Sequence, residues 1–77
     1  AMELNTITKM NVDKIVKRFG GVNELHHRLL AKGVDVNPKT IEKWRERRRI
    51  PSWRLLQIIA LAKVEGQPID ILEYAAN

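Results

Sequence analysis

Basic side chains are concentrated in one short part of this 77-residue chain. Residues 39–54 contain seven lysines and arginines and two glutamates, whereas residues 55–77 contain one lysine and three acidic residues. Four arginines, Arg45 and Arg47 to Arg49, fall within five consecutive positions. Guanidinium groups this close repel one another, and phosphate oxygens are ligands that they bind in a bidentate geometry. The cluster therefore predicts a partner rich in phosphate, with a role in solubility alone as the simpler alternative.

The segment 37–47 has the features of a short helix with two different faces. Asn37 is suited to cap the helix start, and Pro38 stands where a missing N–H costs nothing. Ile41 and Trp44 lie three residues apart, so they share one edge, which we expect to be buried. At about 100° per residue, the opposite side carries four long polar side chains: Lys39, Glu42, Lys43 and Glu46.

The polar side of this helix has the chemistry needed to read base edges in a DNA groove. Lys39 and Lys43 could donate to guanine O6 or N7, and Glu42 could accept from cytosine N4. Charges of alternating sign at these spacings are also typical of an ordinary solvated helix. If this face is considered without the rest of the chain, a solvated surface is the favoured interpretation over a base-reading one. The neighbouring arginine cluster shifts the balance, because phosphates flank any groove that the helix enters.

The rest of the chain is predicted to form four more short helices, so the expected fold is an all-α compact bundle of about five. The apolar spacing and the stop signals place them from Asn11 or Val12 to Phe19, from Val22 to Ala31 or Lys32, from Trp53 to Glu65 after a cap at Ser52, and onward from Pro68. Leu30 is expected to face inward, and Trp53 to cover the core as a lid. The helix after Ser52 is apolar nearly all round, which favours a central position or cover by a second chain. Residues 10–77 are expected to form one domain, preceded by a flexible arm over residues 1–9.

Composition argues against most other classes of function. The net charge is +5, the pI is about 10.0, and there are no cysteines. No catalytic constellation, nucleotide fingerprint or glycine-rich phosphate loop is visible, so we expect no enzyme activity, no cofactor and no small-molecule substrate. His26 and His27 are adjacent and diverge on a helix, so no metal site is expected. No signal peptide or membrane-spanning stretch is visible, and we expect a cytoplasmic, nucleoid-associated protein with no membrane partner.

Several of these residues together resemble a known family. The pattern of Phe19-Gly20-Gly21, Leu25, Thr40-Ile41-x-x-Trp44 and Arg49-Ile50-Pro51 is similar to the phage Cro and repressor-like helix-turn-helix proteins, and most similar to the small Cro-like branch. The resemblance covers about residues 12–71. It differs from the family pattern at His26, where a small residue is usual, at Val22, where glutamine is frequent, and in a longer span between Leu29 and Ile41.

The resemblance implies a lambda repressor-like fold in which the third helix enters the major groove of double-stranded DNA. It places the base-reading residues at Asn37, Lys39, Glu42, Lys43 and Glu46. It places phosphate contacts at Thr40 and, through the start of the second helix, at Asn23, beside those expected of Arg45, Arg47, Arg48 and Arg49. It further implies a prokaryotic or phage transcriptional regulator that binds a palindromic operator as a homodimer. The fourth and fifth helices carry more apolar surface than a thin bundle can bury, which predicts that the dimer interface lies there.

Two other functions remain open on the sequence alone. The apolar fourth and fifth helices also suit a protein-interaction or antitoxin-like adaptor module that reads no DNA. The Thr40-Ile41-x-x-Trp44 and Ile50-Pro51 segments also occur in winged-helix, excisionase-like DNA-binding proteins. The winged-helix, excisionase-like fold requires a β-hairpin after the third helix, which the helical pattern of residues 53–64 disfavours.

Overall fold

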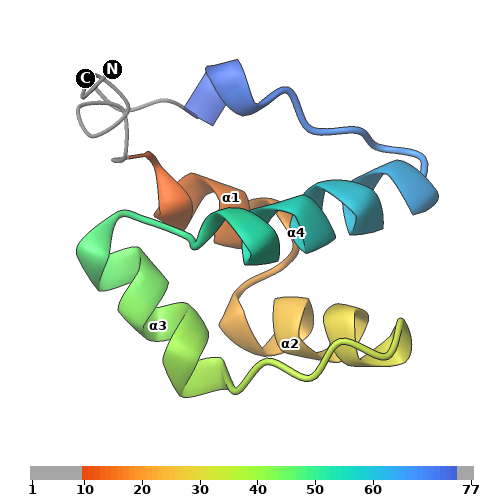
Figure 1. Cartoon of the computed structure of the whole chain (residues 1–77), viewed down its shortest axis with the longest axis horizontal. Coiled ribbons are helices and arrows are strands. Elements are labelled where there is room, and N and C mark those ends of the chain that lie inside the picture. Colours follow the sequence, from red (N-terminus) through yellow and green to blue (C-terminus); the bar gives the residue numbers. More distant parts are fainter. Residues whose placement is uncertain (1–9, 75–77) are drawn as a thin grey trace.

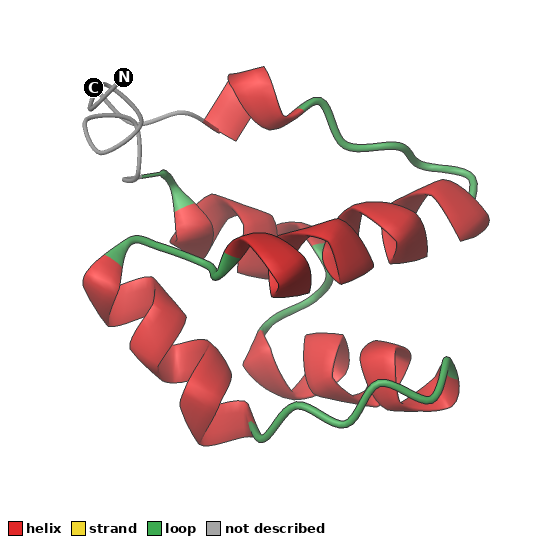
Figure 2. Ribbon diagram, viewed as in Figure 1, coloured by secondary structure: helices red, strands yellow, loops and turns green. Residues whose placement is uncertain are grey.

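Local signals in the sequence set the helices, and all regular structure in the described residues is helical. A computed structural model describes residues 10–74, which contain no strand (Figures 1 and 2). The elements are α1 (Val12–Arg18), α2 (Val22–Ala31), α3 (Pro38–Arg47), α4 (Ser52–Val64) and the 3₁₀ helix η2 (Ile71–Tyr74). The all-α class is thus confirmed. The arm expected over residues 1–9 lies outside the described residues, as do residues 75–77.

Two helix starts form by the side-chain caps that the sequence indicates. The backbone N–H of Lys14 donates to Asn11 Oδ1 at 3.0 Å, and that of Lys39 donates to Asn37 Oδ1 at 2.8 Å. The cap predicted for α4 is wrong, because Ser52 is the first residue of the helix rather than its cap. Pro51 precedes the helix, and no side chain caps it. Pro51 has φ fixed near the helical value and accepts the first helical hydrogen bond at its carbonyl, so the helix starts one residue early.

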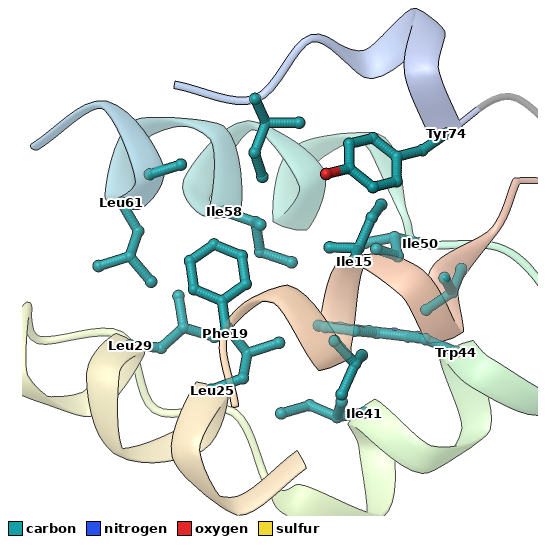
Figure 3. Packing of buried hydrophobic residues seen from close by; sticks show 14 of the residues in the cluster. Ile15, Phe19, Leu25, Leu29, Ile41, Trp44, Ile50, Ile58, Leu61 and Tyr74 are labelled. Atoms are coloured by element: carbon teal, nitrogen blue, oxygen red, sulfur yellow. The ribbon is translucent and has the colours of Figure 1, made fainter. Parts of the chain in front are cut away.

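The core lies where α1, α2 and α3 meet α4. Ile15, Leu25, Ile41 and Ile58 contribute one side chain from each of these helices, and each is at most 1% exposed. Figure 3 shows these residues converging with Trp44, whose ring lies flat between α1 and α3. In a close-packed core, a change of side-chain volume by even one methylene group alters the packing. The core contacts therefore hold α3 in a fixed position against the other helices.

The C-terminal part of the chain differs from the expected fifth α-helix. Only residues 71–74 are helical, in a single 3₁₀ turn, and residues 67–70 form an irregular strap. The guanidinium of Arg18 on α1 donates to the Tyr74 hydroxyl at 3.0 Å and to the carbonyls of Pro68, at 3.2 Å, and of Gln67. Because these carbonyls are engaged by Arg18, the strap is held to α1 without the hydrogen bonds of a helix.

Part of the apolar surface of α4 points outward. Ile58, Leu61 and Ala62 face the core, whereas four other side chains form an exposed row that we call the outer stripe: Trp53, Leu56, Ala60 and Val64. The expected lid position of Trp53 is therefore wrong. Its ring is 60% exposed and lies beneath the Arg54 guanidinium, 4.0 Å from the ring centroid. Leu30, expected to face inward, is 46% exposed on α2.

The connection between α2 and α3 is fixed by a histidine. His26 Nδ1 lies 2.7 Å from the Val36 carbonyl oxygen, and it must carry the proton because a carbonyl only accepts. His26 thus links the middle of α2 to the longer connection. Within residues 10–74 no three metal-binding side chains gather, and no helix has the length and apolar character needed to cross a membrane. The excisionase-like alternative is disfavoured, since α4 stands where its hairpin would be.

Candidate nucleic-acid interface

The two faces of α3 have the opposite characters that the sequence predicts. Ile41 is fully buried and Trp44 is 5% exposed, and both point from α3 into the core (Figure 3). The polar residues of the other face are all exposed, namely Lys39, Glu42, Lys43 and Glu46. Burial of one edge fixes the rotation of the helix about its axis. The same four side chains therefore face the solvent.

The structure places the other predicted contact residues at two helix starts. Asn37 is exposed, and its side-chain oxygen is occupied by the Lys39 N–H, which leaves its amide NH₂ group for a partner. Thr40 is exposed in the first turn of α3. Asn23 is exposed in the first turn of α2, where Gly21 at the N-cap position contributes no capping side chain.

The four clustered arginines do not form one surface. Arg45 is directed toward α1, with its Nη2 2.7 Å from Asp13 Oδ1, and its Nη1 donates to Glu42 Oε1 at 3.1 Å. On a helical wheel Arg45 and Arg47 lie at opposite margins of the buried edge. The charge of Arg45 is compensated by two carboxylates, which sets it apart from the other three arginines.

Asp13 is the residue on α1 that forms the ion pair with Arg45. Its other oxygen, Oδ2, lies 3.0 Å from Lys17 Nζ. The hydrogen bond from Lys17, together with the positive charges of Lys17 and Arg45, holds the pKa of the Asp13 carboxyl below its usual value, although partial desolvation opposes this. The carboxylate is therefore ionised at neutral pH and bridges α1 to α3.

Arg47 and Arg49 lie together on the side of α3 that is remote from Asp13. They line an open hollow of about 290 Å³, with Trp44 and Pro51 as the apolar part of its wall. Within residues 10–74, no acidic side chain forms an ion pair with either arginine, or with Lys39 or Lys43. This margin of α3 carries positive charge that the described residues do not neutralise.

Arg48 ends α3 in an unusual backbone conformation. Its φ of 59° and ψ of 34° are left-handed, a region that favours glycine and costs other residues about 1–2 kcal/mol. Its carbonyl accepts the Met10 N–H at 2.8 Å. Its side chain lines a second hollow, of about 370 Å³, beside Asp13, Arg45 and Glu73. An arginine where glycine would fit better indicates a use for its side chain.

Sequence reasoning missed Asp13 and the outward position of Trp53. A clue to the first was present, since Arg45 follows Ile41 by four residues and must lie near the buried edge of α3. No clue to its partner existed, because residues 13 and 45 are joined only by the packing of α1 on α3. The sequence could not predict whether Trp53 faces the core or the solvent, because α4 is apolar on most sides of its helical wheel.

Comparisons with known proteins assign no family. The chain is 35% identical over 65 residues to a 2-isopropylmalate synthase of Neisseria gonorrhoeae. The match covers 82% of this chain and 11% of that enzyme, so the chain spans about a tenth of the length of the curated relative it matches. No family model and no solved structure matches the chain. A segment so small does not carry the activity of the enzyme to this protein.

Proposed function

We propose that this protein binds double-stranded DNA at specific sequences and acts as a prokaryotic or phage transcriptional regulator. In this proposal α2 and α3 form a helix-turn-helix of the lambda repressor-like kind, and α3 enters the major groove. The observation that carries the proposal is the structure of α3 itself. One edge is anchored in the core, the opposite face is polar and exposed, and one margin holds arginines that no described carboxylate pairs with.

The exposed face of α3 matches a groove in size and in chemistry. An α-helix with its side chains is about 10–12 Å across, and the major groove is about 12 Å wide. Lys39 and Lys43 are one turn apart and would donate to successive guanines, while Glu42 and Glu46 would accept from cytosine N4. Asn37, at the tip of the helix, would use its free amide NH₂. Acidic groups beside phosphates are unfavourable unless they pair with a base donor, so the two glutamates favour selective over indiscriminate binding.

Phosphate contacts are assigned to the margin of α3 and to two helix starts. Arg47 and Arg49 would hold one strand, with Arg48 at the turn beyond them. Asn23 would meet the other strand near the N–H groups at the start of α2, which no side chain caps, and Thr40 would meet it through its hydroxyl. Arg45 is proposed to orient α3 through Asp13 and to contribute less to phosphate binding. A homodimer on a palindromic operator completes the proposal, because two half-sites one turn apart give both selectivity and affinity.

Selection from a random oligonucleotide pool tests this function. Wild-type protein and a triple variant, Lys39→Ala with Lys43→Ala and Glu42→Ala, would be carried through equal rounds at moderate salt. We expect the wild type to enrich one motif with two-fold symmetry and the variant to enrich none. The salt dependence of wild-type binding should indicate several neutralised phosphates, at about 0.9 logarithmic units each. Failure of the wild type to enrich any motif would overturn the proposal.

A second candidate is a protein-interaction module, which two observations favour. The outer stripe of α4 exposes apolar surface, and the similar segment of 2-isopropylmalate synthase makes up only 11% of that enzyme. A small segment shared with a much larger protein is what we would expect of an accessory module. If the wild-type protein does not shift sheared DNA in a gel at moderate salt, the protein-interaction function replaces the DNA-binding function as the proposal.

A further inference from the structure

The outer stripe of α4 is an apolar surface with a shape of its own. Trp53, Leu56 and Val64 are each 60–66% exposed, and Ala60 is exposed between them. At about 100° per residue the four positions fall within about 80° of one another, so they form a single row along the helix. Trp53, at the N-terminal end, is the bulkiest, and the row narrows to Ala60 and Val64. Monomeric proteins rarely leave such a row uncovered.

An apolar hollow adjoins the narrow end of this row. It lies between α2 and α4, has a volume of about 210 Å³, and is lined mainly by Leu29, Val34, Leu61 and Val64. Lys32 stands at its rim. A cavity of roughly 150 Å³ already accepts a benzene ring, so the hollow is large enough for much of an indole. One molecule thus carries an exposed aromatic side chain at one end of α4 and a matching recess at the other.

A second copy of the chain brings these two features together. The α4 residues that line the hollow are centred between residues 60 and 61, so Trp53 and the hollow are about seven or eight residues apart, which is roughly 11 Å along the helix. If two α4 helices cross in antiparallel fashion near Gln57, each Trp53 reaches the hollow of the other copy. The arrangement is isologous and closed, so both aromatic side chains are buried at once and no open surface remains to form a fibre.

The helix dipole of α4 favours the same antiparallel pairing. In an antiparallel pair the N-terminal end of one α4, with Arg54, lies beside the C-terminal end of the other, where Glu65 follows the helix. Arg54 already lies over its own Trp53, and Glu65 is already paired with Arg28 of its own chain at 3.1 Å, so the contact requires no new ion pair. The helix dipoles are also opposed favourably.

From these observations we infer that the chain forms a two-fold dimer through α4, in which Trp53 of each copy occupies the α2–α4 hollow of the other. The inference rests on the homodimer of the proposed function and assigns its surface, register and anchoring residue. The face is on α4, whereas the DNA-binding face is on α3, so both can be occupied together. Two indoles of about 150–250 Å² each, with Leu56 and Ala60 around them, make a contact smaller than the standard interface of about 1,600 Å². We therefore expect a dissociation constant in the micromolar range.

Sedimentation equilibrium without DNA tests the pairing. We expect the wild type to pass from monomer to dimer between about 1 and 100 μM, with a blue shift of tryptophan emission as Trp53 leaves water. Trp53→Ala should raise the dissociation constant at least about thirty-fold, the effect of removing a central aromatic anchor. Leu72→Ala, which truncates an 82% exposed leucine on η2, is the matched control and should leave the constant unchanged. Circular dichroism verifies that each variant is folded.

A mixing experiment tests the exchange between copies. Val64→Glu places a charge at the hollow and should weaken self-association as Trp53→Ala does. A mixed dimer of the two variants retains one intact contact. In it, Trp53 of the Val64→Glu variant enters the unaltered hollow of the Trp53→Ala variant. The mixture should therefore associate more tightly than either variant alone. No recovery on mixing would overturn the proposed exchange.

The sedimentation and mixing experiments test the α4 dimer independently of DNA binding. A wild type that is monomeric at 100 μM, or a Trp53→Ala variant that associates like the wild type, overturns the inference even if the protein binds DNA. A dimer with the expected mutational pattern that enriches no DNA motif supports the inference and overturns the DNA-binding function. In that second case α4 remains the self-association surface of a module with another role.

Discussion

Arg45 on α3 and Asp13 on α1 form an ion pair, with 2.7 Å between Nη2 and Oδ1, that joins the first helix to the proposed groove helix. The same guanidinium also binds Glu42 on the exposed face of α3. Arg45 thus connects the scaffold to a residue that we assign to base reading. A side chain held in this way is oriented before DNA arrives, which lowers the entropy lost on binding.

The Asp13 carboxylate should make the stability of the protein depend on acid pH. Its pKa is lowered in the folded state, so its contribution is present above the unfolded value of about 3.9 and is lost as pH falls through the folded value. Asp13→Asn should therefore destabilise the protein near pH 7, and the difference from wild type should shrink below about pH 4. Urea unfolding at several pH values measures this. Asp35→Asn, in the exposed α2–α3 connection, is the control for charge removal; an identical pH dependence for both variants would contradict the role of the ion pair.

The clustered arginines should separate into two classes. Arg49→Met should lower affinity for all DNA sequences and reduce the salt slope by about one unit, because it removes one phosphate contact but keeps most of the aliphatic stem. Arg45→Met should change the slope little, since Asp13 and Glu42 already compensate its charge. Binding titrations from 50 to 300 mM salt compare the two. Equal changes of slope would show that the ion pairs of Arg45 give way to phosphate on binding.

The sequence predicted the helices well where short-range chemistry determines them. Asn11 and Asn37 cap helices by bonds to residues two or three positions away, and Ile41 and Trp44 are buried as their spacing requires. These features depend on neighbours along the chain. The exposed face of α3 followed from the buried one, because a helix with one edge anchored has a single opposite side.

Features set by contacts between distant segments could not be predicted in this way. The strap over residues 67–70 depends on Arg18, about fifty positions earlier, and without that partner Pro68 indicated a helix start. The orientation of Trp53 depends on which side of α4 faces α2 and the core, and an almost uniformly apolar helix gives no sign of it. The left-handed Arg48 was equally hidden, because no glycine marks the end of α3.

Arg48 should show a conflict between stability and DNA binding. Arg48→Gly relieves the left-handed strain of about 1–2 kcal/mol, less the greater freedom of glycine in the unfolded chain, so a net gain of about 0.5–1 kcal/mol is expected. DNA affinity should fall at the same time, with a salt slope lower by about one unit. Thermal unfolding and binding titrations give the two quantities. A variant that is both more stable and fully active would show that the side chain has no part in phosphate binding.

Lys43 provides the most direct test of base reading. It lies on the exposed face of α3, roughly opposite the buried Ile41, and no carboxylate in residues 10–74 holds its amine. Lys43→Ala should cost about 1–3 kcal/mol of binding to the selected site and remove the preference at one or two base pairs. Lys63→Ala removes an equal charge from the exposed side of α4 and should reduce affinity by much less, without loss of preference. If Lys43→Ala weakened binding to selected and random DNA equally, the lysine would act on phosphate alone, and α3 would be a docking element that reads no sequence through this residue.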